Sequence, residues 1–155
     1  MPSADGLPVL IVGDVHGDLE RLFSGLKPYP PDRWRTIFLG DLVDGGPFGV
    51  GALRYARDRP HSTVLLGNHE VLMLAALRDR VERGPGLHAW LGAAGQPHDL
   101  EELAHDEPLQ EWLRRRPAMM MLLTWSGSKI APTAIVAMPT SLRMRSANGV
   151  WYMRP

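Results

Sequence analysis

Three short apolar runs in the first half of the chain share one pattern. Residues 9–12, 36–39 and 63–66 each mix β-branched with other apolar side chains, and a glycine ends each run. Continuous apolar runs of this kind are typical of strands that are buried on both faces of a sheet. The three glycines lie 27 residues apart, an interval that suits one strand followed by one helix.

The segments that follow these runs repeat apolar positions at helical spacing. Residues 18–26, 49–59 and 69–83 carry apolar side chains three and four positions apart. Asp18 is placed to cap the first helix, and Pro60 stops the second. The predicted order βαβαβα implies an α/β fold with a parallel sheet and right-handed crossovers.

Beyond Gly84 the periodic pattern is weaker. We predict further helices over residues 87–91 and 99–116, and strands over residues 118–123 and 129–138. The rest of the chain mixes polar and apolar positions without a firm period.

Composition narrows the class of protein. The net charge is zero at pH 7, so neither nucleic acid nor a membrane surface is an expected partner. The chain has no cysteine, which excludes disulfides and thiolate metal sites. It has no basic start followed by an apolar stretch, and no apolar run of about 18 residues. We therefore expect a cytoplasmic protein without a signal peptide or a membrane span.

Charged residues are unevenly distributed along the chain. All 17 acidic residues lie at or before Glu111, and all six histidines lie at or before His105. The last 44 residues contain no acid but hold seven basic residues. A single folded domain rarely divides its acids in this way, so we expect the chain to change character near Leu122.

Polar residues follow each of the three glycines. Asp14, Asp41 and Asn68 each come one position after the glycine that ends a strand. The carboxyl ends of parallel strands emerge at one edge of a sheet, where ligands bind, so these three side chains should converge. Their neighbours along the chain add further polar groups: His16, Asp18, Asp44, His69 and Glu70.

This set of donors indicates a metal site. Carboxylate, imidazole and amide oxygen together suit a borderline divalent ion such as Mn, Fe or Zn, and a dication relieves the repulsion among the carboxylates. Each residue taken singly is also a common turn or cap residue. We expect Asp18 to act as a cap and Glu70 as a favourable charge at a helix N-terminus.

Three motifs together resemble the signatures of a known family. They are Gly-Asp-Val-His-Gly-Asp at residues 13–18, Gly-Asp-Leu-Val-Asp-Gly-Gly-Pro at 40–47 and Gly-Asn-His-Glu at 67–70. All three, in this order, resemble the calcineurin-like metallophosphoesterases, and most of all their phosphoprotein phosphatase branch with its bacterial serine/threonine phosphatases. The resemblance covers residues 8–121. It implies that the chain holds the βαβαβα half of a four-layer α/β/β/α sandwich, with the second half missing or divergent.

The resemblance also implies ligands for two divalent metal ions. Asp14 and His16 would bind the first ion, Asp41 would bridge both, and Asn68 would bind the second. The family supplies further histidines from its C-terminal half, but this chain has no histidine after His105. The second ion would keep two protein ligands and the first three, the number that catalytic zinc sites often keep. Either two ions bind or only one is retained.

Catalytic roles follow from the same resemblance. His69 would protonate the leaving oxygen or steer the phosphate, and Asp44 would orient its imidazole. The family mechanism is attack of a metal-bound hydroxide on phosphorus. The family's middle signature has an arginine that clamps phosphate where this chain has Gly45, so a bidentate contact is lost. Arg54 or Arg57 on the following helix would have to replace it.

Two classes of function remain open. The chain is either a metal-dependent hydrolase of phosphate monoesters, acting on phosphoproteins or small phosphoesters, or a non-catalytic remnant with an incomplete two-metal site. A second enzymatic alternative is hydrolysis of dinucleoside polyphosphates. We expect residues 1–121 to form the phosphoesterase part and residues 122–155 a divergent tail or the product of a frameshift. An incomplete sandwich would leave apolar sheet surface uncovered, which favours self-association.

Overall fold

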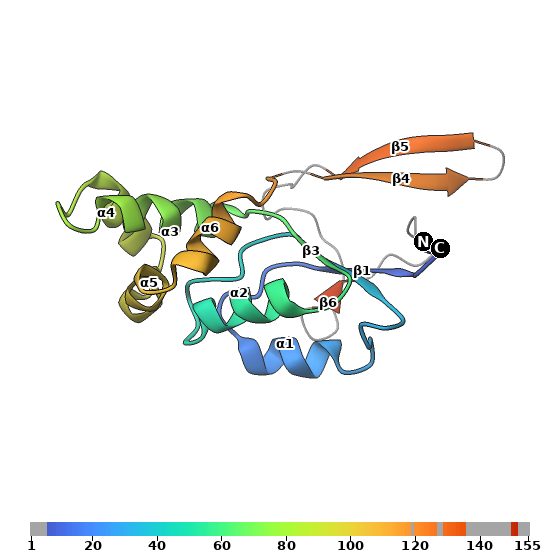
Figure 1. The fold of residues 1–155 in the computed structure, drawn as a ribbon, viewed down its shortest axis with the longest axis horizontal. Coiled ribbons are helices and arrows are strands. Elements are labelled where there is room, and N and C mark those ends of the chain that lie inside the picture. Colours follow the sequence, from blue (N-terminus) through green and yellow to red (C-terminus); the bar gives the residue numbers. More distant parts are fainter. Residues whose placement is uncertain (1–5, 119, 127–128, 136–149, 152–155) are drawn as a thin grey trace.

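The computed structural model describes residues 6–118, 120–126, 129–135 and 150–151. Its main sheet has the strand order β3-β2-β1-β6 (Figure 1). The strands are β1 (Val9–Val12), β2 (Arg35–Phe38), β3 (Ser62–Val64) and β6 (Val150–Trp151). The first three are parallel, and β6 is antiparallel to β1. The predicted α/β fold with a parallel sheet is confirmed, whereas β6 was not predicted.

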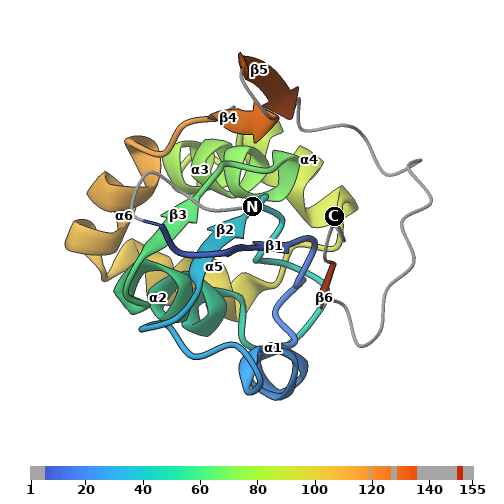
Figure 2. The ribbon, with the colours of Figure 1, turned by 90° about the vertical axis from the view of Figure 1, so that its right-hand side faces the viewer.

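Each parallel strand is followed by a helix, as the periodicity predicts. These helices are α1 (Leu19–Leu26), α2 (Gly49–Asp58) and α3 (Asn68–Asp79). Figures 1 and 2 show α1 and α2 along one side of the sheet. The Asp18 carboxylate accepts a hydrogen bond from the backbone N–H of Arg21 at 3.0 Å, so its predicted role as a helix cap is confirmed.

Three shorter helices follow α3 and gather with it at one end of the molecule (Figure 1). They are α4 (Pro85–Gly92), α5 (Pro97–Ala104) and α6 (Glu107–Arg114). The prediction of one helix over residues 99–116 is wrong, because the chain breaks between α5 and α6. Asp106 caps α6 by accepting from the backbone N–H of Leu109 at 3.0 Å. Pro108 has no N–H to continue a helix from α5.

The strands predicted after the helices are present. β4 (Met120–Ser126) and β5 (Lys129–Ile135) form an antiparallel hairpin that projects from the rest of the molecule in Figure 1. Residues 136–138 of the second predicted strand lie outside the described residues. Before the hairpin, the Leu66 backbone N–H donates to the Pro117 carbonyl at 2.9 Å, which holds the chain beside the end of β3.

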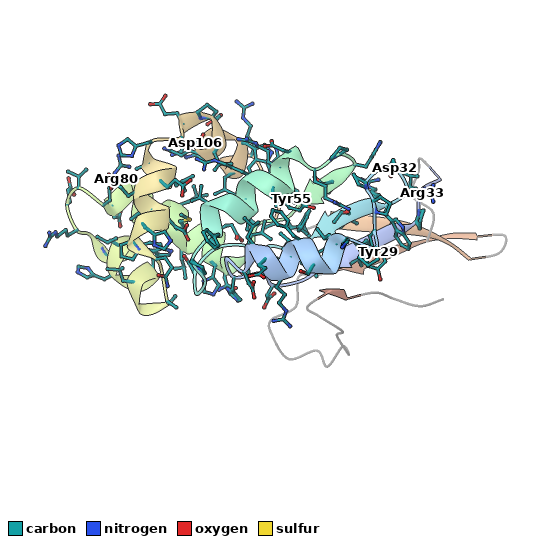
Figure 3. The ribbon with its side chains drawn as sticks, turned by 90° about the horizontal axis from the view of Figure 1, so that it is seen from below. Tyr29, Asp32, Arg33, Tyr55, Arg80 and Asp106 are labelled. Atoms are coloured by element: carbon teal, nitrogen blue, oxygen red, sulfur yellow. The ribbon has the colours of Figure 1, made fainter. Side chains whose placement is uncertain are left out.

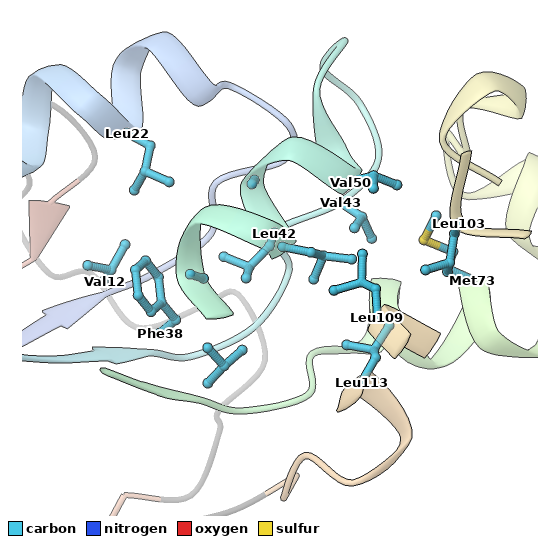
Figure 4. Packing of buried hydrophobic residues seen from close by; sticks show 14 of the residues in the cluster. Val12, Leu22, Phe38, Leu42, Val43, Val50, Met73, Leu103, Leu109 and Leu113 are labelled. Carbon is cyan, nitrogen blue, oxygen red and sulfur yellow. The ribbon is translucent and has the colours of Figure 1, made fainter. Parts of the chain in front are cut away.

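A single apolar cluster joins the sheet to the helices. Figure 4 shows Val12, Phe38 and Leu42 in one buried apolar cluster that extends to Leu109 and Leu113 of α6. This packing fixes the strand ends against the helical end of the molecule.

The other face of the central strands is also buried. Ile11 and Ile37 point away from Val12 and Phe38, and they are only 8% and 2% exposed. The uncovered apolar surface expected for an incomplete sandwich is therefore not found on β1 and β2. Among the described residues, no helix is long and apolar enough to cross a lipid bilayer.

Candidate metal and catalytic site

The loops that follow β1 and β2 are joined by backbone hydrogen bonds. The N–H groups of Val15 and His16 both donate to the Asp41 carbonyl at 3.0 Å, and the Gly46 N–H donates to the His16 carbonyl at 2.8 Å. These bonds bring the first two motifs together at the carboxyl edge of the sheet. The convergence that the strand pattern predicts is thus observed for these loops.

Three site residues adopt a left-handed backbone. The φ angles of His16, Asp41 and Asp44 are 50°, 52° and 68°. Positive φ is uncommon outside glycine and tends to occur where function needs a strained conformation. The described part of the chain has six non-glycine residues of this kind, so half of them lie in this one site.

Glycines permit the second and third loops to approach closely. Gly40 has a φ of 102°, a conformation that side chains rarely tolerate. A Cβ atom at Gly67 would overlap the backbone N and the carboxylate of Asp41. The glycines before Asp41 and Asn68 therefore allow the second and third loops to pack against each other.

His16 is held in an orientation that suits a metal ligand. Its Nδ1 lies 3.2 Å from the Val43 carbonyl, and its Nε2 lies 3.9 Å from Oδ2 of Asp14. The side chains of His16 and Asp14 are 41% and 46% exposed. Metal-binding histidines generally donate the other ring N–H to a carbonyl or carboxylate in this way. The His16–Asp14 pair therefore fits a divalent cation in chemistry and in exposure.

Asp41 lies between the first pair and the third loop. Its Oδ1 accepts a hydrogen bond from the backbone N–H of His69 at 3.0 Å, and Asn68 is exposed in the first turn of α3. Within the part of the chain that the structure describes, no three histidine, aspartate or glutamate side chains gather into a closed metal-binding group. Asp14 and His16 are thus brought together, with Asp41 on the adjoining loop.

His69 and Asp44 form a hydrogen-bonded pair. Nδ1 of His69 lies 2.9 Å from Oδ2 of Asp44, and the His69 ring meets the His16 ring edge to face at a centroid distance of 4.7 Å. Asp44 is fully buried. Burial raises the pKa of Asp44, while hydrogen bonds from His69 and Trp90 act against the rise. The pair has the arrangement expected of an oriented proton donor.

Glu70 joins the second and third loops, a role that its predicted place at a helix N-terminus did not indicate. Its buried carboxylate accepts from the backbone N–H of Asp41 at 2.8 Å, Leu42 at 2.7 Å and Gly67 at 2.8 Å. Burial raises the pKa of Glu70, and these N–H donors oppose the rise. In a capping box a glutamate three positions after the N-cap accepts from the N-cap N–H, and Glu70 makes this bond with Gly67. Because glycine lacks the side chain that marks the motif in a sequence, none of the three bonds was readable from the sequence.

The arginines proposed to replace the family's phosphate clamp are engaged elsewhere. Gly45 is exposed. Arg54 donates to Asp106 at 2.8 Å and also pairs with Glu102, and Figure 3 shows Asp106 at the helical end of the molecule. Arg57 pairs with its neighbour Asp58 at 2.7 Å. Arg54 and Arg57 therefore do not replace the missing contact in this structure.

Comparison with known families agrees with this geometry. The family model of the calcineurin-like phosphoesterases matches residues 7–129, which includes all three loops. The chain belongs to the calcineurin-like phosphoesterases.

Individual relatives show which kind of protein within this family the chain is similar to. The chain is 31% identical over 120 residues to a symmetrical bis(5'-nucleosyl)-tetraphosphatase of Methylococcus capsulatus, an alignment that covers 72% of this chain and 38% of the relative. It is 32% identical over 123 residues to the enzyme of the same name from Edwardsiella ictaluri, covering 74% and 39%. The chain thus spans well under half the length of these relatives.

A solved structure supports the fold. A metallophosphoesterase from Sphaerobacter thermophilus superposes with a TM-score of 0.52 at 21% sequence identity, and the match covers 76% of this chain and 44% of that protein. At this identity the similarity concerns the fold alone.

Proposed function

We propose that this chain is the metal-binding part of a hydrolase that cleaves phosphoester or phosphoanhydride bonds. One observation carries the proposal: the His69–Asp44 pair lies directly against His16, whose free ring nitrogen faces Asp14. A proton donor beside a candidate cation site is the arrangement that metal-assisted hydrolysis requires. Family membership supports the same class of reaction.

In this proposal, one set of residues binds the metal ions and another transfers the proton. Asp14, His16 and Asp41 would hold a first divalent ion, and Asp41 with Asn68 would contribute to a second. Bound divalent ions neutralise charge on phosphoryl oxygens and acidify water. The metal in question is Mn, Fe or Zn, as the donor types suggest.

His69 is the proposed proton donor. In the hydrolysis, oxygen of water bonds to phosphorus and the bond from phosphorus to the leaving oxygen breaks. The leaving oxygen then needs a proton, and Nε2 of His69 is available because Nδ1 is held by Asp44. Asp44 keeps the ring oriented and stabilises its protonated form.

The substrate class that we propose is the dinucleoside polyphosphates. The relatives at 31% and 32% identity carry the name bis(5'-nucleosyl)-tetraphosphatase, so similarity favours this alternative over the phosphoprotein substrates that the motif resemblance suggested first. The lack of an arginine at Gly45 leaves either substrate with a weaker phosphate contact.

A non-catalytic role is the second candidate. It is favoured by the absence of a closed three-ligand group among the described residues and by the engagement of Arg54 with Asp106 and Glu102. A protein of this kind would bind one metal ion through Asp14 and His16 and would hydrolyse no substrate.

The decisive experiment measures hydrolysis and metal binding on the same preparations. The chain is incubated with manganese and diadenosine tetraphosphate, or with a chromogenic phosphate monoester, and compared with Asp41→Asn. Asp32→Asn is the matched control, because Asp32 is an exposed carboxylate in the loop before β2, at the edge of the sheet opposite the site.

We expect metal-dependent product formation that Asp41→Asn lowers about 100-fold and Asp32→Asn leaves unchanged. Equal rates in all three proteins would refute the enzymatic proposal. Manganese binding can be measured by electron paramagnetic resonance. Binding that depends on Asp14 and His16, in a protein that hydrolyses neither substrate, would establish the non-catalytic alternative.

A further inference from the structure

Trp90 reaches the candidate site from a helix that carries none of the three motifs. Its indole Nε1–H lies 2.8 Å from Oδ1 and 3.0 Å from Oδ2 of Asp44. Both Trp90 and Asp44 are 0% exposed. The donor therefore spans both oxygens of a buried carboxylate whose Oδ2 also contacts His69.

These contacts leave the Asp44 carboxylate little freedom. A carboxylate on a short side chain can rotate about its terminal bond, and the bond to His69 engages only one of its two oxygens. The Trp90 N–H, shared by both oxygens, fixes the position of the whole group, while the bond to His69 sets its rotation. The His69 ring then takes its orientation from a carboxylate that is held at both oxygens.

The short segment that follows α4 fixes the position of Trp90. The Gly95 backbone N–H donates to the Trp90 carbonyl at 3.0 Å, and a Cβ atom at Gly95 would overlap the indole ring. The Gly45 N–H donates to the Ala94 carbonyl at 3.1 Å. The same short segment is thus fastened both to Trp90 and to the loop that carries Asp44.

We propose that Trp90 is a positioning residue that holds the Asp44 carboxylate in the place from which it orients His69, so that the ring presents Nε2 to the site. This role rests on the proposed function of His69, but the geometry that it describes exists without substrate or metal. A tryptophan that merely fills the core would need its ring volume and not its N–H.

The test removes the N–H and keeps an aromatic ring. In Trp90→Phe, we expect the His69 imidazole to lose its single Nδ1–H tautomer and to exchange between both tautomers, as seen by nitrogen-15 NMR of the metal-free protein. Trp34→Phe is the matched control, because Trp34 packs edge to face on Tyr29. It should leave His69 unchanged. Where hydrolysis is measurable, Trp90→Phe should lower kcat about tenfold with KM unchanged.

Two outcomes overturn the role of Trp90. One is an unchanged His69 tautomer in Trp90→Phe while Asp44→Asn alters it. The other is measured in the unmodified chain and does not require the variant to fold: the indole proton of Trp90 exchanges with water as fast as that of Trp112, whose side chain is only partly buried. A chain without hydrolytic activity but with a slowly exchanging Trp90 indole and the expected change of tautomer would refute the proposed function alone and leave the positioning role standing.

Discussion

The carboxylate of Glu70 accepts a hydrogen bond from the backbone N–H of Asp41 at 2.8 Å, across 29 positions of sequence. It also accepts from Leu42 and Gly67. A side chain on α3 therefore fixes the backbone of the loop whose aspartate is the proposed bridging ligand. The left-handed conformation of Asp41 persists because this carboxylate binds the backbone on both sides of the residue.

Replacing Glu70 by glutamine tests this relationship. One acceptor oxygen becomes an NH₂ group that faces backbone N–H donors, so buried donors lose their partner. We expect Glu70→Gln to lower the free energy of unfolding by about 3 kcal/mol in urea titrations. Glu82→Gln is the control, because Glu82 is exposed. A loss no greater than that of the control would show that the loop does not depend on the carboxylate.

The site should gain phosphate affinity from an arginine at position 45. A Cβ atom at Gly45 meets only His16, at 3.6 Å and beyond, so space exists, although the φ of 79° imposes strain on any side chain. Gly45→Ala carries the same strain without the guanidinium and is the matched control. With manganese present, we expect Gly45→Arg to bind inorganic phosphate about tenfold more tightly than Gly45→Ala in calorimetry. Equal affinities would argue against a phosphate position beside this loop.

Helix α2 is capped from α5 by Asp99. The buried Asp99 carboxylate accepts from the backbone N–H of Gly49 at 3.2 Å and Val50 at 3.1 Å. Asp99→Ala should lower the free energy of unfolding by about 2 kcal/mol, because two donors at a helix start lose their acceptor. Glu101→Ala, an exposed change on the same helix, should have little effect. Similar midpoints for both variants in thermal unfolding would disprove the capping role.

Stability should depend on pH through Asp106. The Arg54 guanidinium holds the pKa of Asp106 below its ordinary value of 3.8, so the pair stabilises the fold above about pH 4, and this contribution is lost as the pH falls through the lowered pKa. Asp106→Asn retains a helix cap but removes the charge. We expect it to cost about 1 kcal/mol at pH 7 and progressively less below pH 4. A difference that stays constant between pH 7 and pH 3 would contradict this assignment.

Local pattern was sufficient for the elements of the first half of the chain. The three strands and the three helices after them were predicted because their apolar spacing coincides with their burial in the core. The break at Asp106 was missed because the apolar spacing continues across it, and only the cap and Pro108 mark the end of α5. The division of the chain near residue 121 stays a prediction, and the family match runs to residue 129.

The sequence by itself determined that three glycine-terminated strands would bring Asp14, Asp41 and their neighbours to one edge of a parallel sheet, because strand direction and the period of the elements are local properties. Only the tertiary structure decided what holds those residues in place. Glu70 binds the Asp41 loop and Trp90 binds Asp44, contacts that span 29 and 46 positions of sequence. Such contacts depend on how α3 and α4 pack against the site, and no periodic pattern along the chain records that packing.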